Sequence, residues 1–289
     1  MESPAEFVRG RMNPLQPVLT ECEPHLPRLS EIRSVVFDIY GTLIISAAGD
    51  ISLVSEQESH RGMGEALEIL GRADNESEVE EALGIYRKTI GELQESRRAQ
   101  GAEFPEIEIR DVWKTIAANW QLDESRIEAA ALAYECAVNP CWEMPGAAKM
   151  IGRLERNHFA LGIVSNAQFY TSAVVEGVCG FRLFDEYFDP DLSVFSFLEC
   201  EGKPSRKLFE KVASAANCMG IEKEEILYIG NDFTKDVAPA HEVGFRTALF
   251  AGDERSLRTG SLETAQACSR ADAVLTELPQ LEEVLGLKE

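Results

Sequence analysis

The segment from Arg33 to Ser46 reads RSVVFDIYGTLIIS, and the rest of the chain is organised around it. Its β-branched and aromatic residues, Val35 to Phe37, predict a short strand that is buried on both faces, as in the middle of a parallel sheet. Asp38 follows at the carboxyl end of this strand, where open α/β sheets bind their ligands. A carboxylate there is partly desolvated and still reaches solvent. We therefore expect Asp38 to be a nucleophile or a metal ligand.

The composition indicates a folded, acidic protein. The 289 residues are 45% hydrophobic, which is enough to bury a sizeable core. The 50 acidic and 28 basic side chains give a formal charge of -22, which disfavours nucleic acid and anionic membranes as partners. No apolar run is long enough to cross a bilayer, and the first residues lack the apolar core of a signal peptide, so we expect a cytoplasmic location. Nothing in the composition indicates an oligomeric state.

The seven cysteines are scattered along the chain, without a CxxC pair or a histidine at metal spacing. This distribution favours free buried thiols over disulfides or a zinc site.

The order of the predicted elements indicates a doubly wound α/β fold. A proline-rich N-terminal extension covers residues 1–30, and strand patterns then alternate with helical ones. Residues 43–53 also predict a small hairpin flap beside the first strand. The further predicted strands are FALGIV at 159–164, EILYIG at 225–230, FRTALF at 245–250 and ADAVL at 271–275.

Between the first two long strands, residues 54–138 carry amphipathic helical patterns with few turn signals. We expect this block to be an inserted, all-helical cap subdomain. Residues 31–53 and 139–289 would then form the α/β core, a mostly parallel, Rossmann-like sheet with right-handed crossovers.

Polar residues stand at the edge of this sheet where the ligand crevice should lie. Three carboxylates at one crevice repel one another, so they favour a divalent cation, and all-oxygen ligands favour Mg²⁺. A lysine and a Ser/Asn pair beside the cation supply charge and donors for a tetrahedral oxyanion. The set fits phosphoryl transfer from a small phosphorylated substrate. Its members are Asp38, Ser165, Asn166, Lys203, Asp232 and Asp236.

The order and content of these motifs resemble the haloacid dehalogenase superfamily of hydrolases over residues 33–250. The resemblance implies an α/β core whose active site is covered by a helical cap that sets substrate choice. It also implies that Asp38 forms a covalent aspartyl intermediate. The matching motifs are Asp38-Ile-Tyr-Gly-Thr-Leu43, Ile163-Val-Ser-Asn166, Gly202-Lys-Pro204 and Tyr228-Ile-Gly-Asn-Asp232 followed by Asp236.

The resemblance implies a role for each motif residue. Ser165 would bind phosphoryl oxygens, and Lys203 would offset the charge on nucleophile and phosphate. The register of the fourth motif leaves open whether Asn231 or Asp232 contacts the ion directly. The implied catalytic residues are Asp38, Tyr40, Ser165, Asn166 and Lys203, the substrate-binding ones Thr42, Ser165 and Asn166, and the Mg²⁺ ligands Asp38, the Tyr40 carbonyl, Asp232, Asp236 and Asn231.

Tyr40 departs from the pattern of the family phosphatases. They carry a second aspartate at this position, as acid for the leaving group and base for the attacking water. An unperturbed tyrosine, with a pKa of about 10, is a poor base at neutral pH. Tyrosine here is typical of the haloacid dehalogenases, which work without a metal. Slow turnover, or substrates with good leaving groups such as acyl phosphates, would follow.

The acidic pair Asp232 and Asp236 favours a cation and hence a phosphatase. A Mg²⁺-dependent phosphatase is therefore our leading hypothesis. A metal-free 2-haloacid dehalogenase and a non-catalytic protein that binds a phosphorylated ligand are the alternatives.

Further residues are candidates for substrate contact from the cap or the rim of the site. Arg110 is expected to bind substrate because its guanidinium fork suits phosphate or carboxylate. For the others, an ordinary solvated charge or core position is favoured. They are His60, Arg61 and Trp113 in the cap, and Asp253 and Arg255 after a strand end.

Overall fold

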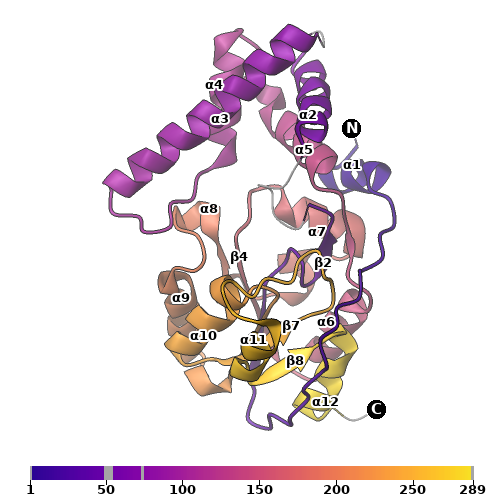
Figure 1. Cartoon of the computed structure of the whole chain (residues 1–289), viewed down its shortest axis with the longest axis vertical. Helices are drawn as coiled ribbons and strands as arrows, with labels where there is room; N and C mark the ends of the chain where they lie inside the picture. The colour runs from indigo at the N-terminus through magenta and orange to yellow at the C-terminus, as the bar shows by residue number, and fades with distance from the viewer. Residues whose placement is uncertain (1, 49–54, 73–74, 288–289) are drawn as a thin grey trace.

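The computed structural model describes residues 2–48, 55–72 and 75–287, and it confirms the mostly parallel α/β sheet (Figure 1). Within these residues, six strands form one sheet in the order β5-β4-β1-β6-β7-β8, and each neighbouring pair is parallel. The strands of this sheet are β1 (Ser34–Phe37), β4 (Ala160–Ser165), β5 (Ser193–Phe195), β6 (Ile226–Gly230), β7 (Arg246–Phe250) and β8 (Ala273–Leu275).

Strand β1 lies in the middle of the sheet and is buried along its whole length, as its apolar sequence predicts. Val36 is in register with Gly162 of β4 on one side and Tyr228 of β6 on the other. The chain runs from β1 outward through β4 to β5, then returns to the other side of β1 for β6, β7 and β8. The direction of strand addition therefore reverses at β1, and such switch points are where doubly wound sheets bind ligands.

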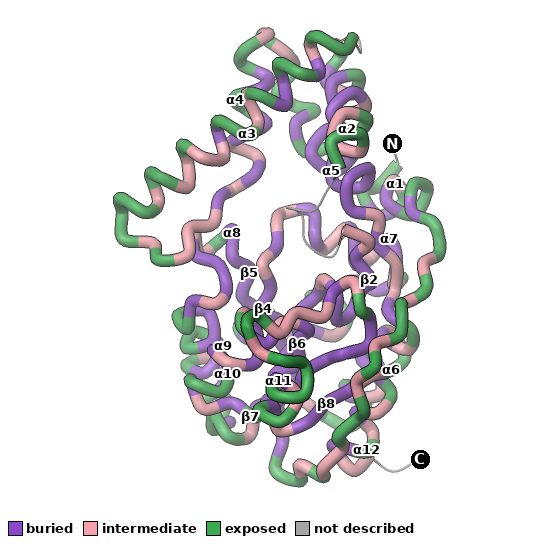
Figure 2. The backbone as a smooth tube through the Cα atoms, in the orientation of Figure 1, coloured by how far each residue is buried: buried purple, intermediate pink, exposed green. Residues whose placement is uncertain are grey.

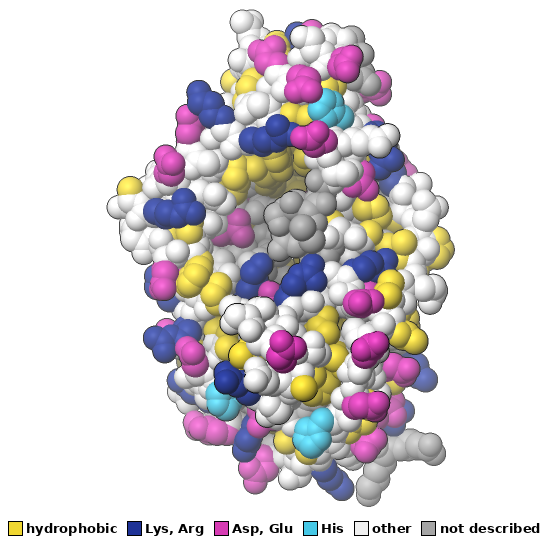
Figure 3. Space-filling model, viewed as in Figure 1, with side chains coloured by type: hydrophobic (Ala, Val, Ile, Leu, Met, Phe, Trp, Pro, Cys, Tyr) yellow, Lys and Arg dark blue, Asp and Glu magenta, His cyan; other side chains and the backbone are white. Residues whose placement is uncertain are grey.

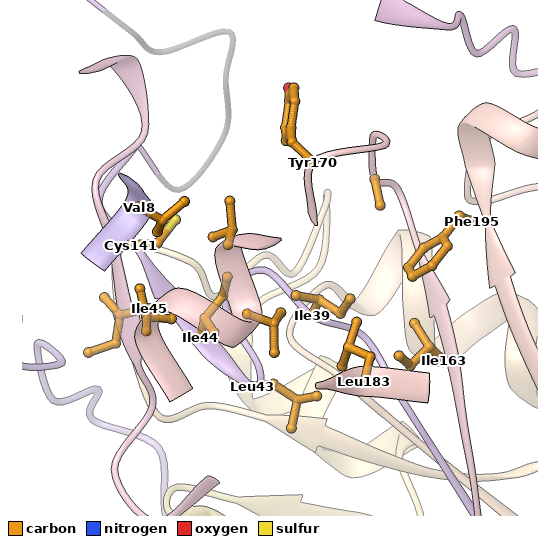
Figure 4. Packing of buried hydrophobic residues seen from close by; sticks show 14 of the residues in the cluster. Val8, Ile39, Leu43, Ile44, Ile45, Cys141, Ile163, Tyr170, Leu183 and Phe195 are labelled. Carbon is orange, nitrogen blue, oxygen red and sulfur yellow. The ribbon is translucent and has the colours of Figure 1, made fainter. Parts of the chain in front are cut away.

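Helices cover both faces of the sheet. Val35 and Phe37 point to the face covered by α6, α7 and α12, and Val36 points to the face covered by α9 and α10. Figure 2 shows the strands as the buried centre of this part of the molecule, and Figure 4 shows the apolar packing on the first face. The helices here are α6 (Ala147–Arg156), α7 (Thr171–Cys179), α8 (Ser196–Glu199), α9 (Arg206–Cys218), α10 (Ala238–Val243), α11 (Thr264–Arg270) and α12 (Leu281–Leu285), with short 3₁₀ or π turns η3 (Leu183–Tyr187), η4 (Pro190–Leu192), η5 (Lys223–Glu225), η6 (Phe233–Val237) and η7 (Leu278–Gln280).

The described residues between β2 and β3 form a layer of helices beyond the carboxyl edge of the sheet (Figure 1). Trp113 is fully buried there and packs edge-on against Tyr86 and Tyr134, so it is a core residue of this layer. The division into a core and a cap subdomain remains a prediction. The helices are α2 (Glu56–Ile69), α3 (Glu76–Ala99), α4 (Ile109–Asn119) and α5 (Ile127–Val138), with the turn η2 (Glu124–Arg126) before α5.

The connection between α3 and α4 is held against the sheet side of the molecule. Pro105 forms an antiparallel bridge with Glu201, and the Gly202 amide donates to the Phe104 carbonyl over 2.7 Å. The side chain of Gln168 binds both the Ile107 carbonyl and the Ile109 amide. These contacts place the connection directly beside the motifs at Ser165 and Lys203.

The N-terminal extension packs on the α/β core. It begins with α1 (Pro4–Arg11), whose Val8 lies so close to α7 that a Cβ on Gly177 would come within 2.7 Å of it. Farther along, His25 forms a bridge with Val274 of β8. No helix among the described residues is long and apolar enough to span a membrane.

Only the first half of the hairpin flap predicted at 43–53 lies within the described residues. Its first half forms β2 (Ile44–Ser46), which pairs antiparallel with the distant strand β3 (Cys141–Glu143). The predicted second run, at 51–53, lies outside the described residues. The two segments that enter and leave the helical layer are therefore tied together at its base.

Candidate active site

Asp38 stands directly after β1, and its amide donates to the Ile229 carbonyl of β6 over 2.9 Å. Its side chain is almost buried. The Ser165 hydroxyl donates to its Oδ1 over 2.7 Å, and Lys203 Nζ lies 2.9 Å from the same oxygen. Burial raises the pKa of Asp38 although the positive charge of Lys203 opposes this. The carboxylate is thus fixed in direction at the switch point of the sheet.

Lys203 joins Asp38 to a second buried carboxylate. Its Nζ lies 2.6 Å from Asp236 Oδ1, and the two side chains are 3% and 1% exposed. The Tyr228 hydroxyl lies 3.0 Å from the same oxygen, and the Asp232 amide donates to the other Asp236 oxygen over 2.9 Å. Burial tends to lower the pKa of Lys203, but Asp236 and Asp38 together raise it. The lysine therefore stays charged between two anions.

The close packing of Asp236 depends on Gly230 at the end of β6. A Cβ on Gly230 would lie 2.4 Å from Asp236 Cγ, so a larger residue cannot stand there without a shift. Asn166, after β4, accepts the Lys203 amide over 2.7 Å at its Oδ1. The Ser-Asn pair thus serves two purposes, because Ser165 orients Asp38 and Asn166 orients the backbone of Lys203.

Asp232 has a carboxylate oxygen available at the cavity. Its Oδ1 accepts the amides of Thr234 and Lys235, whereas its Oδ2 accepts no hydrogen bond from the described residues. Burial and the charge of Asp236 raise the pKa of Asp232. Asn231 uses its amide elsewhere, since its oxygen accepts the Thr42 hydroxyl over 3.1 Å and its nitrogen donates to the Ser256 carbonyl over 2.7 Å. This arrangement argues against Asn231 as a metal ligand.

The available oxygen donors are those that Mg²⁺ prefers. Three oxygens could act as metal ligands: Asp38 Oδ2, Asp232 Oδ2 and the Tyr40 carbonyl. None of them accepts a hydrogen bond in the described part of the chain. No group of three or more His, Cys, Asp or Glu side chains forms a ready metal cluster among the described residues. Mg²⁺ is commonly held by one or two carboxylates and several waters, so a donor set of two carboxylates and a carbonyl fits it.

The surroundings of the Tyr40 hydroxyl do not favour a role as a general acid or base. Its hydroxyl lies 3.2 Å from the Thr171 hydroxyl at the start of α7. Burial, with the nearby charge of Glu135, raises the pKa of Tyr40 well above its usual value of 10.0. The side chain lines the cavity as a packing and hydrogen-bonding group.

These residues open into a cavity of about 370 Å³ between the sheet and the helical layer. Figure 3 shows the hollow, with apolar side chains on its upper wall and Lys and Arg side chains along its lower edge. Arg258 reaches the cavity because its amide donates to the Asn231 carbonyl and its carbonyl accepts the Phe233 amide. Among the described residues, the charged side chains that line the cavity are Asp38, Glu106, Glu135, Lys203, Asp232, Lys235, Asp236 and Arg258.

Several predicted contacts are not made. The Arg110 guanidinium binds Glu108 and Glu128 and does not line the cavity, so the prediction that it contacts substrate is not supported. Thr42 is fully buried and supports Asn231 from behind.

The weaker candidates are also engaged elsewhere. His60 pairs with Glu80, and Arg61 donates to the Ala137 carbonyl. Asp253 and Arg255 pair with each other at the rim of the core. None of these four side chains lines the cavity in the described part of the chain.

The sequence reasoning missed two glutamates and two cations of the cavity wall. Glu135 had a signal, because it is the one acid in the apolar stretch AAALAYECAV. Lys235 lies inside the fourth motif, between Asp232 and Asp236. Glu106 and Arg258 lie in loops, where no hydrophobic periodicity indicates which way a side chain points.

Residues 32–244, most of the chain, match the family described as haloacid dehalogenase-like hydrolase. Over 145 residues the chain is 32% identical to a glyceraldehyde 3-phosphate phosphatase of Pyrococcus furiosus, covering 50% of this chain and 54% of that protein. The chain therefore spans about half the length of this curated relative.

Two solved structures show the same fold at low identity. One is a HAD phosphatase from Thermococcus onnurineus, with a TM-score of 0.53 at 19% identity, covering 88% of this chain and 98% of that one. The other is a 2-haloacid dehalogenase from Pseudomonas syringae, with a TM-score of 0.55 at 19% identity and the same coverage. Together with the family match, the motifs and their geometry place this chain among the haloacid dehalogenase-like hydrolases.

Proposed function

We propose that this hydrolase is a Mg²⁺-dependent phosphatase that acts on a small phosphorylated metabolite through a covalent intermediate on Asp38. The observation that carries the proposal is the buried Asp38 carboxylate, held by Ser165 and Lys203 at the floor of a cavity that Lys235 and Arg258 also line. A nucleophile with cations around it suits an anionic phosphoryl group. The curated relative, a phosphatase, supports the same activity.

The chain's own residues account for the two steps. The Asp38 carboxylate attacks phosphorus, the ester P–O bond breaks, and the leaving oxygen takes a proton from water. A water molecule then attacks the aspartyl phosphate and gives a proton to the hydroxide left by the first step, the bond between Asp38 and phosphorus breaks, and inorganic phosphate leaves with the Asp38 carboxylate restored. Lys203 offsets the charge of nucleophile and phosphate in both steps. Because Tyr40 replaces the usual acid, substrates whose leaving groups need little protonation should react fastest.

Asp38, Asp232 and the Tyr40 carbonyl are the groups that would hold Mg²⁺. When bound, the ion supplies positive charge that reduces repulsion between the carboxylates and the phosphoryl oxygens. Asp236 is engaged by Lys203 and acts through it.

Phosphate release from a panel of phosphate esters tests the proposal. The panel contains glyceraldehyde 3-phosphate, other small sugar and alcohol phosphates, aryl phosphates and acetyl phosphate, with Mg²⁺ and with EDTA. We expect phosphate release that needs Mg²⁺ and disappears in Asp38→Asn. No release that depends on Asp38 from any member would reject a phosphatase.

Tyr40 favours a second candidate, a metal-free 2-haloacid dehalogenase. In such a reaction the Asp38 carboxylate displaces halide from carbon, and no leaving-group acid is needed. Halide release from short 2-haloacids that continues in EDTA would support this activity. If neither phosphate nor halide is released while phosphorylated compounds raise the thermal stability, a non-catalytic binding protein is the remaining function.

A further inference from the structure

A buried carboxylate stands on the helical wall of the cavity. Glu135 of α5 lines the cavity and is 5% exposed. The Tyr170 hydroxyl donates to its Oε2 over 2.9 Å, and Asn139 Nδ2 donates to its Oε1 over 3.0 Å. Asn139 is held in turn by the Ser46 hydroxyl over 2.7 Å. The carboxylate is therefore oriented by groups from both the helical layer and the core.

Glu135 has no counter-charge within the described chain. No Lys or Arg side chain described in the structure forms an ion pair with it, and residues 49–54, which are not described, contain no cationic residue. Burial raises the pKa of Glu135, and its two hydrogen bonds oppose this. Buried carboxylates in proteins are normally paired with a cation. A ligand that brings positive charge would complete this site.

The cations of the cavity belong to a different part of its wall. Lys203, Lys235 and Arg258 all come from segments of the α/β core that follow β5, β6 and β7, with Lys235 in the turn η6. Lys203 is bound to Asp38 and Asp236, so it is not a partner for Glu135. The cavity thus has its cations near the nucleophile, whereas its helical wall carries Glu135 without a cation.

The neighbours of Glu135 favour a hydrogen-bond donor. Tyr170 and Asn139 each direct a donor at the carboxylate, yet an ionised carboxylate has about four acceptor sites. The second glutamate of the wall, Glu106, is likewise bound by the Ser196 hydroxyl and the Ile107 amide. An ammonium group supplies three donors and the missing charge, whereas a hydroxyl supplies one donor and no charge.

We propose that the substrate is a small phosphomonoester that carries a protonated amine, with its phosphoryl group at Asp38 and its ammonium group bound by Glu135. This inference rests on the proposed phosphatase function for its catalytic part. Its binding part does not depend on catalysis: the cavity should bind any ligand that has an anionic phosphorus group and an amine a few bonds away.

A matched series of compounds tests the inference. The substrates are 2-aminoethyl, 2-hydroxyethyl and ethyl phosphate, with the corresponding three-carbon set, and kcat/KM is measured by phosphate release. Charge-assisted hydrogen bonds of this kind correspond to a preference of about 10- to 100-fold for the amine over the hydroxyl compound. Equal kcat/KM for amine and hydroxyl compounds in both chain lengths would overturn the proposal.

Two variants test whether Glu135 causes the preference for the amine substrate. Glu135→Gln keeps the size of the side chain but removes its charge, and it should reduce the amine preference to below about threefold. Glu128→Gln is the matched control, because Glu128 is an exposed residue of the same helix whose side chain binds Arg110 outside the cavity. An undiminished amine preference in a folded Glu135→Gln protein would assign the ammonium site elsewhere and overturn the proposal.

Binding of phosphonates separates this inference from the phosphatase proposal, because their C–P bond replaces the ester bond that is cleaved. Calorimetric titration of the unmodified protein compares 2-aminoethyl-, 2-hydroxyethyl- and ethylphosphonate. A Kd at least about 10-fold lower for the amine supports the ammonium site, even where no phosphate ester is hydrolysed and the phosphatase function fails. Equal Kd values reject the site, even where phosphate esters are hydrolysed.

Discussion

Replacing Lys203 with methionine tests whether the ion pairs at Asp38 hold the site together. Lys203 Nζ lies 2.9 Å from Asp38 and 2.6 Å from Asp236, and the lysine side chain is 3% exposed. Methionine fills similar space without charge, so the variant leaves two buried carboxylates facing each other. Removing one partner of a buried ion pair costs about 3–5 kcal/mol of unfolding free energy. We expect a loss of this size at pH 7, measured by urea unfolding with tryptophan fluorescence.

The loss should shrink as the pH falls. Burial already raises the pKa of Asp38 in the presence of Lys203, and without the lysine it rises further. The folded variant then binds more protons than the unfolded chain between the unfolded pKa of about 3.9 and the raised folded value. Stability therefore decreases as the pH rises through that window, and the deficit at pH 5 is smaller than at pH 7.

Lys207→Met is the matched control. Lys207 is an exposed lysine at the start of α9 whose Nζ lies 3.8 Å from the buried Glu201, and because the lysine stays in solvent we expect this long contact to contribute less than about 1 kcal/mol. If the Lys203 variant lost no more stability than the Lys207 variant, or lost the same amount at pH 5 and pH 7, the reasoning about the buried ion pairs would be refuted.

Three further predictions concern Tyr40, two glycines and the thiols. Tyr40→Phe should keep phosphate release within about threefold, whereas loss of an acid–base group would cost about 100-fold or more. Gly230→Ala should lower the unfolding free energy by about 1–3 kcal/mol, because its Cβ would meet a buried carboxylate at 2.4 Å. Gly84→Ala, in an open position of α3, should raise it by about 0.5–1 kcal/mol, and thermal unfolding compares the two. A thiol reagent at pH 8 should modify the exposed Cys218 first and spare Cys136, whose pKa burial raises to about 12, until the protein unfolds.

The strands that the sequence predicts are those buried on both faces. These predicted strands are β1, β4, β6, β7 and β8, whose mainly apolar runs favour a buried strand over other structures. Strand β5 was missed because it has three residues inside an aromatic stretch with no alternation. The partner of β2 was missed because strand pairing across distant segments depends on how the helical layer returns, which no local pattern encodes.

The sequence predicts those residues of the site that follow the carboxyl ends of the strands. Asp38, Ser165 and Asp236 meet because parallel strands bring their carboxyl ends to one edge. Arg110 was misplaced because its helical position gives no information on which neighbour binds it, and Glu108 is two residues away. Glu135 lies inside an apolar helix that otherwise reads as a core element, and a lone acid in such a helix indicates a buried charge that requires a partner.

The charges at the cavity floor bear on which reaction the protein catalyses. Lys203 is shared between Asp38 and Asp236, so these three residues together carry one negative charge, and Asp232 adds another. Lys235 and Arg258, which also line the cavity, bring the formal charge of the floor to zero when only the described residues are counted. A phosphoryl group adds up to two negative charges, which a divalent cation offsets, whereas the carboxylate of a haloacid adds one. The same count explains why the two activities should respond differently to EDTA, since a dianion placed against Asp38 and Asp232 without a cation faces uncompensated repulsion in a partly desolvated site.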